Sequence, residues 1–173
     1  PLENRIWRSY DQQAAYFEGN SFRPNAVGRV LDDGTTQVVR YRYNATGQIT
    51  NIIDPIGRSL SFIYSTNQVD LLEVKQSMNT NQLVVLKVEY NAHHRPVALR
   101  NASRFIVTNA YNDRGQLLTT TNPKGETTAF TYNTNGYLQA IDGPMPGQED
   151  LVTLRYDPLG RVREMVQTDG YAT

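Results

Sequence analysis

The chain of 173 residues contains no cysteine, which excludes disulfide bonds, thiolate metal sites and a thiol nucleophile. It also has no net charge, because 17 Lys and Arg balance 17 Asp and Glu. A protein that holds nucleic acid by neutralising phosphates usually has a basic surplus, so nucleic-acid binding is not indicated. No apolar run approaches the roughly 20 residues of a transmembrane helix. The composition therefore excludes several common classes of protein before any motif is considered.

The beginning of the sequence and its aromatic content give two further expectations. Residues 1–5 include no initiating Met and lack the pattern of a secretion signal, so we expect an excised or processed piece of a longer protein. Hydrophobic residues make up only 39%, yet 11 Tyr and 5 Phe are spread along the chain. A disordered chain is poor in aromatic residues and rich in net charge. The composition therefore indicates a folded protein.

Tyrosine recurs at nearly regular intervals along the sequence, which is the signature of a repeat architecture. Six tyrosines are separated by 21, 26, 21, 21 and 24 residues: Tyr43, Tyr64, Tyr90, Tyr111, Tyr132 and Tyr156. Asn or Asp follows each of them except Tyr64. A glycine usually follows three residues later, namely Gly47, Gly115, Gly136 and Gly160. A second turn block, Asx-Pro-x-Gly, comes ten residues after Gly47 and again ten residues after Gly115.

Each of these blocks predicts a reversal of the chain. Asn or Asp bonds its side chain to the backbone ahead, Pro presets φ, and Gly accepts the left-handed conformation. The segments between blocks are rich in Thr, Ile, Leu, Phe and Tyr and predict β-strands: 48–53, 58–64, 116–121 and 126–132. Two strands and two turns fill one repeat of 21 residues. The sequence therefore predicts an all-β fold, an antiparallel meander of about a dozen strongly twisted strands.

Strand geometry assigns a structural role to the recurring residues. Residues 21 apart lie at a matching height on every second strand, about 10 Å from one another. Tyr41 and Tyr43 share one face of their strand, as do Phe130 and Tyr132. Cross-strand aromatic pairs stabilise a sheet collectively. We therefore expect the six tyrosines and the four glycines that follow them to be structural anchors of the repeat.

The motif around these tyrosines resembles the YD-repeat family, also called Rhs repeats. The clearest copies are Tyr-Asp-Pro-Leu-Gly-Arg-Val at 156–162 and Tyr-Asn-Asp-Arg-Gly-Gln-Leu at 111–117. The resemblance covers residues 43–173, and residues 29–42 resemble a copy of the repeat whose motif is poorly preserved. We therefore divide the chain into a degenerate or capping segment, 1–28, and a continuous sheet of repeats, 29–173. In the first segment, Ile6, Trp7, Tyr10, Ala14 and Phe17 fit either a short helix or a degraded strand pair that ends at Gly19.

The resemblance implies a function as well as a fold. Proteins of this family wind many such hairpins into a spiralling β-sheet that closes as a hollow shell. In bacterial polymorphic toxins and Tc toxins the shell surrounds a C-terminal toxic domain, and in teneurins a similar barrel contributes to adhesion. The implied function is that of a non-enzymatic scaffold without cofactors, partnered by the remaining repeats and an enclosed toxin domain, and exported by a bacterial toxin-delivery system or displayed at the cell surface. The alternative is a cell-surface recognition module that binds glycan or protein.

No residue of the sequence is predicted to be catalytic or to bind a metal or a cofactor. His93 and His94 are adjacent and align with a turn of the repeat, and neighbouring side chains rarely converge on one metal. The acidic pairs Asp32/Asp33 and Glu149/Asp150 lie beside glycines without the spacing of a calcium loop. No serine occupies a Gly-x-Ser-x-Gly elbow. Tyrosine rings also stack on sugars, but a binding site requires aromatics at one place, so the regular recurrence favours the structural role.

Overall fold

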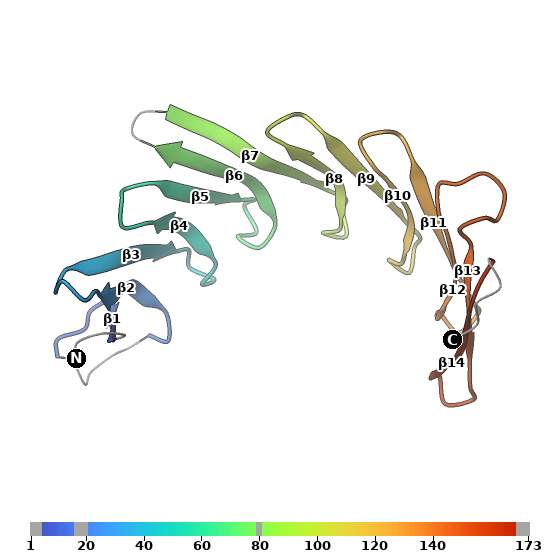
Figure 1. Ribbon diagram of the computed structural model, residues 1–173, viewed down its shortest axis with the longest axis horizontal. Helices are drawn as coiled ribbons and strands as arrows, with labels where there is room; N and C mark the ends of the chain where they lie inside the picture. The colour runs from blue at the N-terminus through green and yellow to red at the C-terminus, as the bar shows by residue number, and fades with distance from the viewer. Residues whose placement is uncertain (1–4, 16–20, 79–80, 169–173) are drawn as a thin grey trace. The chain divides into compact units, whose positions relative to one another are not determined.

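The protein is built from β-strands joined by short turns (Figure 1). The computed structural model describes residues 5–15, 21–78 and 81–168, and this part of the chain contains fourteen strands and no helix. The strands are β1 (Ile6–Tyr10), β2 (Pro24–Val30), β3 (Thr36–Tyr43), β4 (Ile49–Ile53), β5 (Ser59–Tyr64), β6 (Leu71–Met78), β7 (Asn81–Tyr90), β8 (Pro96–Asn101), β9 (Ile106–Tyr111), β10 (Leu117–Thr121), β11 (Thr127–Tyr132), β12 (Leu138–Asp142), β13 (Val152–Tyr156) and β14 (Val162–Gln167). The predicted all-β class is confirmed.

The strands pair antiparallel in the order of the chain. Two compact units divide the chain, Pro1–Val88 and Glu89–Thr173. In the first unit, β1 to β6 and all but the last two residues of β7 form a meander in which each strand pairs with the next. In the second unit, β8 to β14 do the same. The meander of hairpins predicted from the tyrosine period is therefore the observed topology of each unit.

The strand boundaries differ from the predicted ones by one residue. Strands β4, β5, β10 and β11 end where the sequence predicts, but each begins one residue later. The displaced residue belongs to the turn. At Gln48, for example, the backbone carbonyl accepts a 2.9 Å hydrogen bond from the Asn44 amide and closes the reversal before β4 begins.

Each unit is a single layer of strands, so few side chains are fully enclosed. The buried hydrophobic residues of the described chain are Val74 (8% exposed) and Val88 (7%) in the first unit, and Ala98 (7%) in the second. No polar or charged residue in that part is buried. With so little core, strand pairing and contacts between neighbouring side chains must supply most of the stability.

At the N-terminus the structure decides between the two interpretations of the sequence. Residues Ile6–Tyr10 form β1, which pairs with β2 through Trp7 opposite Gly28, so they are a strand and not a helix. Ala14 lies beyond the end of this strand. Phe17 and Gly19 lie outside the described residues. Nowhere in the described chain is there a helix long and apolar enough to cross a membrane.

Candidate functional site

The recurring tyrosines all lie at one edge of the sheet in each unit. Each of them ends an odd-numbered strand. In five of them, the hydroxyl donates a hydrogen bond to the carbonyl of the first residue of the preceding strand. The five bonds are Tyr43 to Pro24 (3.0 Å), Tyr64 to Ile49 (3.0 Å), Tyr111 to Pro96 (3.0 Å), Tyr132 to Leu117 (2.9 Å) and Tyr156 to Leu138 (2.8 Å). Tyr90 takes the equivalent place at the end of β7. Each bond closes the open end of a hairpin. We call the row of turns that follow these tyrosines, at one end of the strands, the tyrosine edge. The row of turns at the other end of the strands is the opposite edge.

A β-bulge accompanies the tyrosine in every one of these five strands. Tyr111 pairs with Leu117, whereas the preceding residue, Ala110, pairs with Thr119, so Leu118 is an extra residue on β10. The same shift occurs at the other four tyrosines, with Thr50, Leu72, Gln139 and Arg163 as the extra residues. A bulge bends its strand and increases the local twist. The twist is therefore introduced at the same edge in each repeat.

Four turns of the tyrosine edge have a glycine in the same backbone conformation. In the turn after Tyr111, the amide of Gly115 bonds the carbonyl of Asn112 at 2.8 Å, and Gly115 has a φ of 81°. The side chain of Asn112 accepts the amide of Gln116 at 2.9 Å. Gly47, Gly136 and Gly160 take the same place with φ of 85°, 87° and 77°. The four glycines expected from the sequence thus occupy a conformation that other residues adopt with strain.

Two turns of this edge have no glycine at that place. His94 adopts a φ of 59° there, and its amide bonds the Asn91 carbonyl at 3.0 Å. His93 donates its amide to the Asn91 side chain at 2.9 Å, so both histidines lie in the turn that the alignment of repeats predicts. After Tyr64 the turn starts at Ser65 and is one residue longer, because the Ser65 amide bonds the carbonyl of Asp70.

In three turns of the second unit, the residue directly after the position with positive φ contacts the next turn of the same edge. The side-chain amide of Gln116 donates to the Gly136 carbonyl at 2.7 Å. Arg95 lies across the Cα of Gly115, with its guanidinium carbon 6.0 Å from the centre of the Tyr111 ring. Tyr137 lies over Gly160. These contacts between consecutive turns were not predicted from the sequence. The recurrence of long side chains directly after the glycine could have indicated them.

The first unit has contacts of the same kind. Arg23 lies across the Cα of Gly47. Asn44 and Thr46 each donate a side-chain hydrogen bond of 3.0 Å to the carbonyl of Gln68 in the following turn. At the opposite edge, a Cβ placed on Gly57 or on Gly125 would meet no atom within 4 Å. Neighbouring turns are therefore connected along the tyrosine edge, and these two glycines of the opposite edge have only a conformational role.

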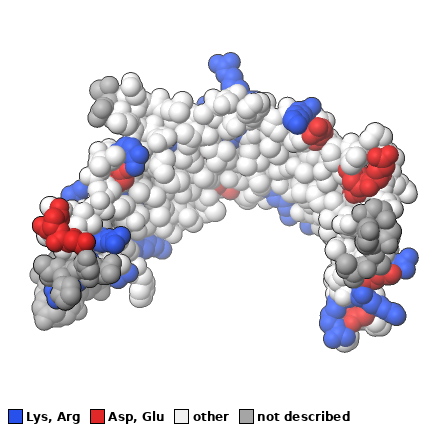
Figure 2. Space-filling model, in the orientation of Figure 1, with Lys and Arg blue, Asp and Glu red and all other residues white. Residues whose placement is uncertain are grey.

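Two turns of the form Asp-Pro-x-Gly-Arg contain an additional ion pair. In the tyrosine edge, Asp157 accepts the Arg161 side chain at 2.7 Å and the Arg161 amide at 2.9 Å. These bonds from the backbone and side chain of Arg161 lower the pKa of the Asp157 carboxyl. In the opposite edge, Asp54 pairs with Arg58 at 2.6 Å, and although burial raises its pKa, the bonds from Arg58 lower it overall. Figure 2 shows acidic and basic groups adjacent at several points of the visible face.

Two further sets of ionisable groups are perturbed within the first unit. Lys75 (3.0 Å) and Lys87 (3.1 Å) both bond the Glu73 carboxylate, and they lower its pKa. Burial raises the pKa of the Tyr43 hydroxyl and of the Tyr64 hydroxyl. All these shifts follow from contacts that hold strands or turns together.

The acidic pairs named from the sequence lie in turns of the opposite edge. Asp33 accepts the amide of Thr35 at 2.9 Å and its hydroxyl at 2.6 Å, and these bonds lower the pKa of Asp33. Its neighbour Asp32 lies in the same turn. Glu149 and Asp150 lie in the loop between β12 and β13, where Asp150 accepts the amide of Met145 at 3.0 Å. Across residues 5–15, 21–78 and 81–168, no three His, Asp or Glu side chains gather in a metal-binding group.

Comparison with known proteins supports the resemblance read from the motif. The family model described as RHS Repeat matches residues 111–144, so the recognition of Rhs repeats is confirmed over that stretch. No curated protein matches the sequence. The fold is similar to solved structures of TcdB2-TccC3 (TM-score 0.66), of TcdB2-TccC3 without its hypervariable C-terminal region (0.66) and of TcdB2-TccC3-Cdc42 (0.65). In each comparison the identity is 13%, and the match covers 87% of this chain but 9% of the other.

Proposed function

We propose that the chain is a structural, non-enzymatic segment of a β-shell, and that the shell of which it is part encloses a C-terminal toxin domain. The observation that carries the proposal is the repetition of one contact. A tyrosine hydroxyl closes five hairpins at 2.8 to 3.0 Å. Within each unit, contacts between turns also join neighbouring repeats. A sheet built this way serves as a wall, because one kind of tyrosine contact recurs along it.

The energetics of such a sheet agree with a wall function. In repeat proteins, each unit contacts only its neighbours, so stability is approximately a sum over repeats and the interfaces between them. A hydrogen bond of the tyrosine kind contributes about 0.5 to 1.5 kcal/mol, which is too little to stabilise one hairpin alone. A long series of repeats is stable collectively. The chain is therefore suited to be a stretch of a continuous wall, with residues 29–173 as repeats and 1–28 as a degenerate or capping part.

The partners and the location of the protein follow from the same proposal. The partners are further repeats of the shell, at the free edges of β1 and β14, and an enclosed toxin domain. The likeness to Tc-toxin structures supports export through a toxin-delivery system. Since the chain spans 9% of those chains, the enclosed domain and the export route are features proposed for the whole protein.

The test is the structure and protease resistance of the complete protein. We expect electron cryomicroscopy to place β1–β14 in the wall of a hollow shell, with a separate domain inside. That domain should resist protease in the intact protein and be digested when it is expressed alone. In a combined Tyr111→Phe, Tyr132→Phe and Tyr156→Phe variant, the enclosed domain should become digestible at a lower urea concentration than in the control variant Tyr137→Phe. A domain outside the shell, or equally digested in both contexts, would contradict enclosure.

A further inference from the structure

A cavity of about 490 Å³ lies between two turns of the tyrosine edge in the second unit. One side is formed by the turn after Tyr132, with Asn133 and Asn135, and the other by the turn after Tyr156, with Pro158. Its volume is within the range of roughly 300 to 1,000 Å³ that is usual for small-molecule sites. The position of this cavity, between consecutive repeats, corresponds to the gap that Gln116 bridges one repeat earlier.

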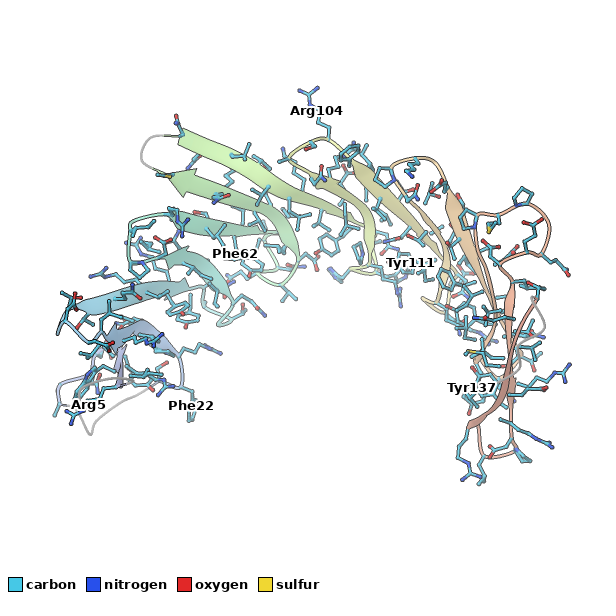
Figure 3. All side chains as sticks on the ribbon, viewed as in Figure 1. Arg5, Phe22, Phe62, Arg104, Tyr111 and Tyr137 are labelled. Carbon is cyan, nitrogen blue, oxygen red and sulfur yellow. The ribbon has the colours of Figure 1, made fainter. Side chains whose placement is uncertain are left out.

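Tyr137 makes this repeat different from the others. In the other turns of the tyrosine edge that have Gly or His at the position with positive φ, the next residue is Gln or Arg: Gln48, Arg95, Gln116 and Arg161. Where Gln116 forms a hydrogen bond to the next turn, the ring of Tyr137 instead stacks on Tyr156, with centroids 5.0 Å apart and planes at 26°. Its side chain remains 42% exposed. The ring of Tyr137 reaches Gly160 of the next turn, and both residues line the cavity that remains between the two turns. Tyr137 is labelled in Figure 3.

This tyrosine does not belong to the structural ladder. The ladder tyrosines recur at the strand ends and donate their hydroxyls to backbone carbonyls, as Tyr132 does to Leu117. The hydroxyl of Tyr137 makes no hydrogen bond to any described residue. A structural support recurs in the repeats, whereas a binding site requires an aromatic residue at one place. Tyr137 meets this second condition, because it lies outside the 21-residue recurrence.

The remaining lining residues supply polar groups of one chemical kind. Asn133, Asn135 and Gln139 all line the cavity with side-chain amides, which both donate and accept hydrogen bonds. The Asn133 oxygen accepts the Tyr137 amide at 3.0 Å, whereas its amide nitrogen has no bond in the described chain. Asn135 and Gln139 are exposed, and their amides bond no described residue. Three amides are thus available to a ligand.

The charged groups of the cavity are neutralised by partners. Arg155 pairs with Glu164 at 3.0 Å, and Asp157 pairs with Arg161 at 2.7 Å. A ligand with a formal charge would therefore gain no unpaired counter-charge here. The lining favours an uncharged ligand with many hydroxyl groups and a flat apolar face.

We propose that this cavity binds a neutral oligosaccharide. The C–H face of a pyranose ring packs on the exposed part of Tyr137, and its hydroxyls bond the amides of Asn133, Asn135 and Gln139. Such a site provides recognition of a glycan surface in addition to the wall function, and it does not depend on whether the shell encloses a toxin domain.

The experiment is a titration of the full chain with neutral oligosaccharides built from glucose, galactose, mannose or N-acetylglucosamine. Binding is followed by saturation-transfer NMR and by calorimetry. We expect saturable binding of at least one of them, and we expect Tyr137→Gln to weaken it about tenfold or more. Tyr137→Phe, which keeps the ring, should retain most of the affinity. Gln139→Ala should also weaken binding.

Two controls separate binding from folding. Tyr137→Gln introduces the residue that occupies this position one repeat earlier, so its melting temperature and circular dichroism should stay close to those of the parent chain. Phe105→Gln removes another exposed ring (57% exposed), at the opposite edge of the same unit, and should leave binding unchanged. Absence of binding at millimolar oligosaccharide, or binding unaffected by Tyr137→Gln, would overturn the proposal and leave Tyr137 as a packing residue. An oligosaccharide that contains a uronic acid is titrated in the same way, and its binding in preference to every neutral one would overturn the proposal as well.

Discussion

The side-chain amide of Gln116 donates a 2.7 Å hydrogen bond to the backbone carbonyl of Gly136, twenty residues further along the chain. One repeat later, Tyr137 spans the same step with its ring and lies over Gly160. In these two repeats the residue after the turn glycine therefore contacts the turn that follows it. Because of this contact, the glycines of the tyrosine edge and of the opposite edge should differ in whether they tolerate an added Cβ.

Gly160→Ala should destabilise the protein more than Gly125→Ala. Both glycines have a positive φ, 77° and 84°, so a Cβ costs about 1 to 2 kcal/mol at either place. At Gly160 the new Cβ would also collide with Tyr137, whose ring is held by Tyr156, and overpacking adds about 1 to 3 kcal/mol. At Gly125 nothing lies within 4 Å. Urea unfolding of the two variants measures the difference.

A second substitution tests the cause of that difference. In a Tyr137→Gln background the flexible amide replaces the ring, so Gly160→Ala should lose its additional cost and resemble Gly125→Ala. An unchanged penalty in this background would show that Tyr137 is not what restricts Gly160.

Tyr132→Phe should lower the free energy of unfolding by about 0.5 to 1.5 kcal/mol, because it removes the 2.9 Å hydrogen bond to the Leu117 carbonyl. Tyr137→Phe is the matched control, since the hydroxyl that it removes bonds no described residue, and its stability should be nearly unchanged. Urea unfolding of both variants checks this prediction. Equal effects of the two substitutions would contradict a stabilising role of the tyrosine hydroxyls.

Arg104→Gly should stabilise the protein. Arg104 adopts a φ of 63° in the turn between β8 and β9, at the edge opposite Tyr111 (Figure 3). Glycine removes the strain of this conformation, which is worth about 1 to 2 kcal/mol, and part of that gain is offset by the greater freedom of glycine in the unfolded chain. An increase in melting temperature is expected, whereas Arg104→Ala, which keeps a Cβ, should give none.

Acid should destabilise the protein through carboxylates with lowered pKa. Glu73 and Asp157 have folded-state pKa values below their ordinary 4.5 and 3.8, so each contributes stability that is fully present above these values. That stability is lost as the pH falls through the lower folded-state pKa. Unfolding free energies between about pH 6 and pH 2 should decline below about pH 4.5. Glu73→Gln should flatten the decline, and a profile unchanged by Glu73→Gln would contradict the contribution of this residue.

Alkali should destabilise the protein through tyrosines with raised pKa. Burial raises the pKa of Tyr43 and Tyr64 above the ordinary 10.0, so their contribution is complete below pH 10.0 and is lost as the pH rises through the folded-state pKa. Ultraviolet difference titration should show late ionisation of two tyrosines, which a Tyr43→Phe, Tyr64→Phe variant removes. Ionisation of all tyrosines at the ordinary pKa would contradict this expectation.

Much of the fold could be predicted because the determinants are local. The Asx side chain and the glycine of each turn act within five residues, so the turn at 112–116 and the end of β11 at Tyr132 follow directly from the sequence. The class, the pairing order and the C-terminal ends of four strands, β4, β5, β10 and β11, were predicted for this reason.

The contacts that define the tyrosine edge could not be predicted in the same way. Tyr111 bonds a carbonyl fifteen residues earlier, and a carbonyl acceptor leaves no mark in the sequence. The turn after Tyr64 depends on Ser65, which lies outside the Asx pattern. At the N-terminus, Ile6–Tyr10 fit a helix and a strand equally by spacing, and only the pairing with β2 decides.

The asymmetry between the two edges also makes a practical difference for engineering. Residues 143–151 already form a longer connection than the other turns opposite the tyrosines, and β12 and β13 still pair across it. A peptide tag inserted at residues 102–104 would enter an exposed turn of the same edge, and we expect it to leave the tyrosine bonds intact. Insertions at these turns would lengthen the chain without removing the tyrosine hydrogen bonds at the other ends of the strands.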